Sequence, residues 1–133
     1  MKKLISLATM AISLYAQNIN TTLESYMAAW NAHDKQKIET YYADDVIWYD
    51  LTYDTTLRGK STVSKAITEA FLESIPDMYW VKSGDIFVSN NTIIYEWVYG
   101  GTADGKKFEI KGISTTSFKN GKIIAQKDYY HVK

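Results

Sequence analysis

Apolar side chains recur at helical spacing in the first third of the chain. The positions are Leu23, Tyr26, Met27 and Trp30. Side chains three or four residues apart lie on one face of a helix, so this spacing predicts an amphipathic helix. The run Thr21-Thr-Leu-Glu24 has the pattern of a capping box, in which the threonine and the glutamate satisfy backbone amides of the first turn. We therefore expect the helix to begin near Thr21.

Two further helices follow from the same pattern. Asp34 is a predicted N-cap for a second helix, whose buried side would carry Ile38, Tyr41 and Tyr42. Gly59 breaks the chain before a third helix over residues 61–74, and Pro76 ends it. The expected inner face of this third helix consists of Val63, Ile67, Ala70, Phe71 and Ile75.

The remaining segments alternate or are rich in β-branched and aromatic residues, which is typical of strands. One strand is expected over residues 46–50, between the second and third helices, and the polar segment 51–57 is interpreted as a loop over a pocket mouth. Four more extended segments are expected over residues 78–89, 92–102, 107–118 and 123–132. Turn sequences separate them: Asn90-Asn91, Asp104-Gly105 and Asn120-Gly121. Asp44-Asp45 is read as a turn or cap pair.

Helices that come first, followed by an antiparallel meander, indicate an α+β fold in which the helices cover one face of a curved sheet. On the expected segment over residues 92–102, alternation places Ile93, Tyr95, Trp97 and Tyr99 on one face. A length of 133 residues fits one domain, and 46% apolar residues allow a substantial core.

Aromatic residues are numerous, with eleven tyrosines and four tryptophans. They either pack the core or form the wall of a ligand cavity, since ligand pockets are mostly apolar and aromatic. The candidates for contact with a ligand are Trp30, Trp48, Tyr95, Trp97 and Tyr130. A formal net charge of zero argues against a nucleic-acid partner. Two distant histidines and no cysteine give no spacing typical of a metal site.

The N-terminus has the pattern of a signal peptide. Lys2 and Lys3 precede an apolar stretch over residues 4–15, and Ala16 offers a small residue at a cleavage point. We therefore predict a signal peptide over residues 1–16, a single domain over residues 17–133, and a periplasmic or secreted protein. The alternative is that these residues form an amphipathic helix of the domain itself.

Several motifs together resemble the nuclear-transport-factor-2-like superfamily in its SnoaL-like branch. They are Tyr26 with Ala-Trp-Asn-Ala-His-Asp34, Tyr42-Ala-Asp-Asp-Val46, Leu57-Arg-Gly-Lys60 with Ile67, Phe118-Lys-Asn-Gly-Lys-Ile123, and Asp128-Tyr-Tyr130. That group includes polyketide cyclases, ketosteroid isomerase and limonene epoxide hydrolase. The resemblance implies a cone-shaped, curved mixed sheet of the cystatin-like α+β barrel type. It also implies a pocket for a small hydrophobic molecule, chemistry without a cofactor, and a homodimer formed through the sheet.

The resemblance also assigns candidate catalytic residues. By analogy with the isomerase, Tyr26 would help to stabilise an oxyanion and Asp50 would be the general base. Ser114 stands where the isomerase has a protonated aspartate as its second oxyanion donor. By analogy with the epoxide hydrolase, Asp128 corresponds to the acid on the last strand. The hydrolase arginine is missing, since Trp97 and Tyr99 lie in that neighbourhood.

Each of these residues also has a structural interpretation. Asp50 shares a strand face with Val46 and Trp48, where burial would raise its pKa toward a useful range for a base. It could equally be an exposed acid that begins a polar loop. Tyr26 could simply pack a helix. By alternation, Asp128 shares a face with Ile124, Gln126 and Tyr130, which is either the pocket or the solvent side. His33 is read as structural, and His131 as a surface residue.

Two classes of function are compatible with these residues. The first is an enzyme without a cofactor that moves a proton next to the carbonyl group of a small hydrophobic compound. Its chemistry would be that of an isomerase, a cyclase or a hydrolase. The second is a non-catalytic module of the same fold that binds a ligand or forms a dimer. Convergence of Asp50, Asp128 and Tyr26 on one cavity would favour the enzyme, and divergence toward solvent would favour the module.

Overall fold

The structure is a computed structural model that describes residues 18–132. The predicted signal peptide, residues 1–16, lies outside the described residues. Within residues 18–132, no helix is both long enough and apolar enough to cross a membrane.

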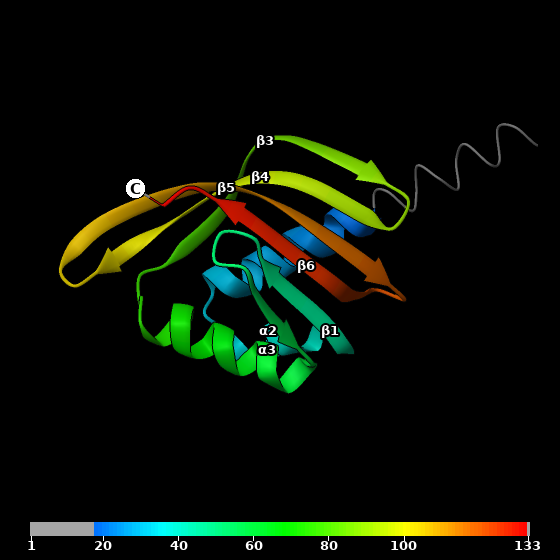
Figure 1. Cartoon of the computed structure of the whole chain (residues 1–133), viewed down its shortest axis with the longest axis horizontal. Helices are drawn as coiled ribbons and strands as arrows, with labels where there is room; N and C mark the ends of the chain where they lie inside the picture. The colour runs from blue at the N-terminus through cyan, green and yellow to red at the C-terminus, as the bar shows by residue number, and fades with distance from the viewer. Residues whose placement is uncertain (1–17, 133) are drawn as a thin grey trace, which may run out of the picture.

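One six-stranded sheet forms the body of the domain (Figure 1). The strands are β1 (Tyr42–Asp50), β2 (Thr55–Arg58), β3 (Tyr79–Ser89), β4 (Thr92–Ala103), β5 (Lys106–Lys119) and β6 (Lys122–Tyr130). Their spatial order is β2-β1-β6-β5-β4-β3. Strands β3 to β6 form the predicted antiparallel meander, and β1 joins it by parallel pairing with β6. The sheet is curved and mixed but does not close, because β2 and β3 remain as edges.

Helices cover one side of this sheet (Figure 1), which confirms the predicted α+β class. They are the helix over residues 18–31, α2 (Lys35–Thr40), and α3 (Lys60–Ile67), which continues as a π-helix, η1 (Thr68–Glu73). Asp34 caps α2 as expected, since its carboxylate accepts a hydrogen bond from the Lys37 amide at 3.1 Å. The predicted capping box at Thr21 is wrong. Residues 18–20 are already helical, so Thr21 lies inside the helix.

Strand β1 is longer than expected and has a partner that the sequence pattern did not predict. It begins at Tyr42 and includes Asp44 and Asp45, so the prediction of a turn or cap pair there is wrong. Both acids are exposed at an irregularity in the pairing of β1 with β6. The segment expected to be a loop is a short turn over residues 51–54 followed by β2. Strand β2 then pairs antiparallel with the end of β1.

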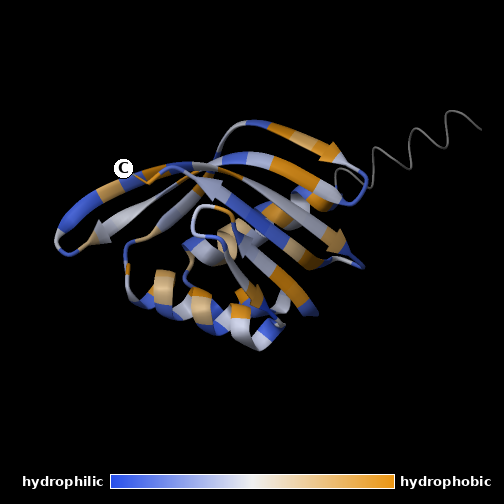
Figure 2. Ribbon diagram, in the orientation of Figure 1, coloured by the Kyte–Doolittle hydropathy of each residue, from blue (hydrophilic) through white to orange (hydrophobic). Residues whose placement is uncertain are grey.

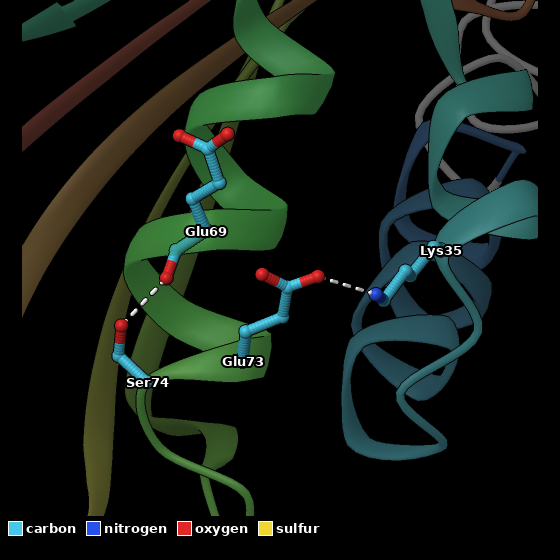
Figure 3. A network of polar contacts seen from close by, with 4 residues as sticks. All are labelled: Lys35, Glu69, Glu73 and Ser74. Carbon is cyan, nitrogen blue, oxygen red and sulfur yellow. Dashed lines mark hydrogen bonds and ion pairs between the residues drawn. The ribbon is translucent and has the colours of Figure 1, made fainter.

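The π-helix changes which side chains of the third helix face the core. A π-helix bonds residues five apart, so its buried face advances by five positions instead of three or four. Ile67 and Leu72 are buried at this spacing, whereas Ala70 is exposed, contrary to prediction. Figure 3 shows the Ser74 hydroxyl donating to the carbonyl oxygen of Glu69, five residues earlier, at 2.6 Å. It also shows the exposed ion pair between Lys35 and Glu73, which joins α2 to η1.

The turns of the meander form as predicted. Asn90, Asp104 and Asn120 all adopt positive φ, a conformation that asparagine and aspartate tolerate better than most residues. The turns of the hairpins are hydrophilic (Figure 2). A bulge where β5 pairs with β6 shifts the alternation before Ala125. As a result Ile123, and not Ile124 as predicted, shares the buried face of β6 with Gln126 and Asp128.

The helix over residues 18–31 packs against the sheet through its predicted apolar face. Leu23 and Tyr26 on this helix are fully buried. The Asn31 side chain fixes the end of the helix to β3, because it exchanges two hydrogen bonds of 2.8 Å with the backbone of Trp80. His33 adopts a left-handed conformation, and its Nε2 lies 3.1 Å from the carbonyl oxygen of Met78. These contacts agree with the structural interpretation of His33.

Candidate functional site

Strand register places one row of large and small residues across the inner face of the sheet. Trp97 on β4 lies opposite Gly112 on β5, which lies opposite Tyr130 on β6. A Cβ atom on Gly112 would come within 3.0 Å of the Trp97 ring, so only glycine lets the indole lie across β5. The ring thereby reaches Tyr130, with 6.1 Å between the ring centroids.

The next row carries the acids. Tyr95 lies opposite Ser114, Ser114 opposite Asp128, and Asp128 beside Asp50 on the parallel strand β1. The register of three strand pairs therefore brings Ser114, Asp128 and Asp50 together, although they are far apart in the sequence.

A pocket of about 230 Å³ opens above these rows, between the sheet and the helices. The residues that line it are Trp30, Trp48, Asp50, Tyr53, Phe71, Trp80, Trp97, Tyr99, Ile110, Asp128, Tyr130 and Val132. Four of the five predicted ligand contacts are among them, and Tyr95 is not. Both predicted acids reach the pocket, so Asp50 and Asp128 converge on one cavity.

Asp128 is the more buried of the two acids. It is only 9% exposed, and its pKa is raised from 3.8 to about 6. Burial is the main cause, because a carboxylate loses hydration in an apolar site, and the nearby charge of Asp50 adds to the effect. Hydrogen bonds from Ser114 and Gln126 act in the opposite direction. The result is a carboxyl group that titrates close to neutral pH.

Ser114 orients Asp128 and has no hydrogen left for a ligand. The indole N–H of Trp97 donates to Ser114 Oγ at 2.7 Å, and Ser114 Oγ donates to Asp128 Oδ1 at 2.5 Å. A serine hydroxyl carries a single hydrogen, so this arrangement uses it on Asp128. Ser114 is also fully buried beside the acid. Because its hydrogen is used on Asp128, it cannot donate to a ligand as the expected oxyanion donor would.

Gln126 holds the same oxygen from the other side. Its Nε2 donates to Asp128 Oδ1 at 2.7 Å, while its Oε1 accepts from the Thr116 hydroxyl. Thr116 in turn contacts the Tyr95 hydroxyl at 2.9 Å, and its own hydrogen is already used, so Tyr95 must donate to it. This buried chain of hydrogen bonds is directed toward Oδ1 of Asp128. Ser114 and Gln126 thus both donate to the same oxygen of Asp128, and the Trp48 side chain is a further hydrogen-bond partner of this carboxyl group.

Asp50 is half-buried at the pocket mouth and organises the turn that follows it. Oδ1 accepts hydrogen bonds from the backbone amides of Thr52 at 2.9 Å and Tyr53 at 3.1 Å. Oδ2 accepts from the Tyr130 hydroxyl at 2.5 Å. Three donors thus surround the carboxylate that was expected, from the sequence, to be the base. Asp50 therefore connects the turn over residues 51–54 to the pocket wall.

Tyr26 does not reach the pocket. It is fully buried, and its hydroxyl pairs with the Tyr42 hydroxyl at 2.5 Å. Burial raises the pKa values of both phenols well above their ordinary value, so both stay neutral. The ring of Tyr26 packs edge-on against Trp30 and Trp80 beneath the pocket. These contacts match the helix-packing interpretation of Tyr26.

Several lining residues were not among the sequence-based candidates. They are Tyr53, Phe71, Trp80, Tyr99, Ile110 and Val132. Alternation did place Tyr99 on the same face of β4 as Trp97, so the sequence could have identified Tyr99 as a lining residue. Phe71 was also expected on the inner face of the third helix, and Tyr53 lies in the segment interpreted as a loop over the pocket mouth, so both had a signal that was not followed to the pocket. His131 is exposed, as expected. In the described part of the chain, no group of three potential metal ligands comes together.

The match to known protein families agrees with this architecture. A model of the SnoaL-like domain matches residues 23–126, most of the chain. The protein therefore belongs to the SnoaL-like family, which confirms the resemblance seen in the sequence. A comparison with curated proteins finds no match to this chain.

Solved structures share the fold at low sequence identity. A protein with a ketosteroid isomerase-like fold from Catenulispora acidiphila, solved in complex with trimethylamine, is 23% identical with a TM-score of 0.71. The match covers 84% of this chain and 85% of that one. Bal32a, from a soil-derived mobile gene cassette, is 15% identical with a TM-score of 0.77, covering 88% and 92%. TerC, co-crystallized with polyporic acid, is 12% identical with a TM-score of 0.74, covering 86% and 92%. Trimethylamine and polyporic acid are different compounds, so the shared fold alone does not select a ligand.

Proposed function

We propose that the protein binds a small, mainly apolar molecule in this pocket and exchanges a proton with it through Asp128. The observation that supports the proposal is a nearly buried carboxyl group on an aromatic wall with a pKa of about 6. General acid–base catalysis is most efficient when the pKa of the group lies near the working pH. This proposal moves the role of base from Asp50 to Asp128.

The hydrogen bonds orient the carboxyl group that would move the proton. Ser114 and Gln126 hold Oδ1 of Asp128, and the carboxyl group takes a proton from a carbon atom next to a carbonyl group of the ligand. The C–H electron pair remains on the ligand as an enolate, and the protonated Asp128 returns the proton to the same or another carbon. Asp50 makes Asp128 a better base, because its charge raises the pKa of the neighbouring carboxyl group.

The two predicted oxyanion donors take no part in this scheme. Tyr26 is paired with Tyr42, and the hydrogen of Ser114 is used on Asp128. We therefore propose proton exchange alone, which is a step that isomerase, cyclase and hydrolase reactions could share. A complete reaction of any of these kinds needs an oxyanion donor other than Tyr26 and Ser114.

Hydrogen–deuterium exchange tests the proposal without a known product. A panel of small cyclic ketones and aromatic ketones would be incubated with the protein in D₂O, and loss of the proton signal next to the carbonyl group would be followed by NMR. We expect faster exchange with the wild-type protein than with buffer, and loss of that acceleration in Asp128→Asn. Asp85→Asn removes an exposed acid outside the pocket and is the matched control. Exchange by Asp128→Asn at the wild-type rate would refute the role of Asp128.

A second proposed function is assembly into a homodimer through the outer face of the sheet, which is the face that points away from the pocket. The exposed apolar residues of this face favour it. Val81, Ile113 and Tyr129 are apolar or aromatic there and are 45%, 45% and 62% exposed. Glu96 lies opposite Ile113 on this face, and Lys111 lies one row away. Charges of both signs beside an apolar patch suit a surface that pairs with a second copy of itself. Sedimentation velocity over a range of micromolar concentrations tests this, and a strictly monomeric protein would refute it.

We also propose that the protein is exported and that residues 1–16 are removed. The support is the order of charged, apolar and small residues at the N-terminus. N-terminal sequencing of the protein recovered from cell fractions tests this proposal. A periplasmic or secreted product that begins near Gln17 is expected, and a full-length cytoplasmic product would contradict it.

A further inference from the structure

The pocket combines aromatic walls with negative charge. Of its twelve lining residues, eight are aromatic, including all four tryptophans of the chain. Two are carboxylates, Asp50 and Asp128, and none is lysine, arginine or histidine. Burial of charge is unfavourable unless the charge is paired, so a ligand group of opposite charge would stabilise these two acids.

The aromatic rings form a continuous wall. The centroid of the Trp80 ring lies 5.3 Å from that of Trp30 and 6.5 Å from that of Trp97. Trp97 is followed by Tyr130 at 6.1 Å, and Tyr130 by Tyr53 at 6.1 Å. This wall runs from beneath the pocket to its mouth, where Asp50 contacts Tyr130.

The two acids are not neutralised by cations in the described part of the chain. The ion pairs found within residues 18–132 are Lys35 with Glu73, Lys65 with Glu69, and Lys82 with Glu24, and none involves a pocket residue. The partners of Asp50 and Asp128 are hydroxyl, amide and indole groups, which are neutral. A positive group of the ligand would supply the missing counter-charge.

We propose that the ligand of this pocket carries an organic cation, a tertiary or quaternary ammonium group held between the tryptophan and tyrosine rings and the carboxylates of Asp50 and Asp128. Ammonium groups of this kind are weakly hydrated and are attracted to the faces of aromatic rings, most strongly to tryptophan. The inference rests on the proposed function, because it specifies the ligand of the same pocket.

A bare metal ion fits the site less well. Divalent ions require six or more oxygen ligands or several bound waters, whereas two carboxylates are the only acidic groups on this mainly aromatic wall. An organic cation needs no fixed coordination geometry, and its methyl groups gain from contact with the rings. The charge and the apolar surface of the pocket thus suit the same ligand group.

Cation binding should depend on pH through Asp128. The groups that act on this carboxyl are Asp50 and Tyr42 from β1, Tyr95 from β4, and Tyr130 on its own strand. The three phenols have raised pKa values and stay neutral near pH 7. Protonation of Asp128 would remove half of the pocket charge, so affinity for a cation should fall as the pH is lowered through about 6.

The test compares a cation with its neutral isostere. Choline and 3,3-dimethyl-1-butanol have the same shape and differ in one atom, nitrogen or carbon, and therefore in charge. Because all four tryptophans line the pocket, intrinsic fluorescence reports on occupancy. Both compounds would be titrated into the full-length protein at a constant ionic strength, set with sodium chloride. We expect choline to bind roughly tenfold more tightly than the alcohol.

Variants separate charge from shape. Asp50→Asn and Asp128→Asn each remove one carboxylate with little change in volume, and each should reduce the preference for choline. Asp85→Asn removes an acid that does not line the pocket and should keep the wild-type preference. If both pocket variants retain the full preference for choline, the assigned charge partners are wrong and the inference is overturned.

The remaining outcomes distinguish this inference from the proposed function. If the alcohol binds as tightly as choline, the cation inference fails while the pocket remains a ligand site. If neither compound binds, the cation inference fails. The deuterium exchange experiment then decides separately whether the pocket accepts neutral carbonyl compounds. Preference for choline that falls at low pH and in both pocket variants supports the inference.

Discussion

At the scale of single residues, Asp128 combines a cost to stability with the chemistry of the pocket. The residue is 9% exposed, and its carboxyl group lies next to a second acid and is held at Oδ1 by Ser114 and Gln126. Functional groups in such surroundings often destabilise the fold, because they are arranged for a reaction and not for folding. The same surroundings that oppose ionisation bring the pKa into the useful range.

Asp128→Asn should stabilise the protein at high pH. The pKa rises from 3.8 to about 6 in the folded state, so protonated Asp128 favours folding, and this contribution is lost as the pH rises through about 6. A shift of this size corresponds to about 3 kcal/mol. Asparagine keeps an oxygen for Ser114 and Gln126 without the charge. We expect a melting temperature several degrees above wild type near pH 8 and a much smaller difference near pH 4.

The control for this measurement is Asp85→Asn, which alters an exposed acid and should change the melting temperature little at either pH. An equal increase in the melting temperature of Asp128→Asn at both pH values would contradict the explanation, because the stabilisation would then not depend on the ionisation of Asp128.

Asp50→Asn should lower the pKa of Asp128. The negative charge of Asp50 opposes ionisation of its neighbour, so its removal favours the charged form of Asp128. The expected change is a shift of the Asp128 titration from about 6 toward 3.8. Carbon-13 NMR of the side-chain carboxyl groups, recorded over a pH series, measures it directly. An unchanged midpoint would show that burial alone sets the pKa.

At the scale of elements, the structure follows the sequence pattern where that pattern is periodic. Alternation placed Trp48 with Asp50, and Tyr95 with Trp97, on the inner face of their strands. The pattern failed where one residue is added to a regular element. Because of the bulge in β6, Ile123 lies on the inner face where Ile124 was expected. Because of the π-helix, Leu72 is buried where Ala70 was expected to be. Such insertions leave no local signature, because tertiary packing selects them.

The candidate site was predictable to a similar extent. Both acids and four aromatic residues were candidates for the pocket wall, because each lies on a regular strand or helix face, but the sequence left both acids open between the pocket and solvent. The direction of the hydrogen bonds could not be predicted. Whether Ser114 donates to a ligand or to Asp128 depends on the register of β5 with β6 and on the indole of Trp97. Three separate strands determine these contacts.

Gly112→Ala should displace Trp97 and destabilise the sheet. The added methyl group would come within 3.0 Å of the indole, so the ring or the strand must move. Overpacking of this kind costs about 1–3 kcal/mol, measured as the loss of unfolding free energy in urea. In a Trp97→Leu background the same change should cost much less, because the clashing ring is gone. Equal costs in both backgrounds would exclude this contact as the cause.

At the scale of the whole molecule, the two faces of one sheet differ in the residues that they expose. The inner face forms the pocket with the helices, and the outer face of β3 to β6 exposes apolar residues among charges. Because strands alternate, Trp97 and Tyr130 point inward while their neighbours Glu96 and Tyr129 lie on the outer face. A second copy on the outer face would therefore contact the backbone behind the pocket wall.

Ile113→Lys should shift the protein from dimer to monomer. Ile113 lies opposite both Glu96 and Tyr129, at the centre of the proposed contact surface, and is 45% exposed. A lysine there would bring its charge into the same position on both copies of a symmetric dimer, where the two would repel. Sedimentation velocity should show a mainly monomeric variant at concentrations where the wild type is dimeric. Leu51→Lys adds the same charge at the 42% exposed turn near the pocket mouth and should leave the dimer intact. Dissociation by both variants would point to net charge instead of the sheet face, and a dimeric Ile113→Lys would place the interface elsewhere.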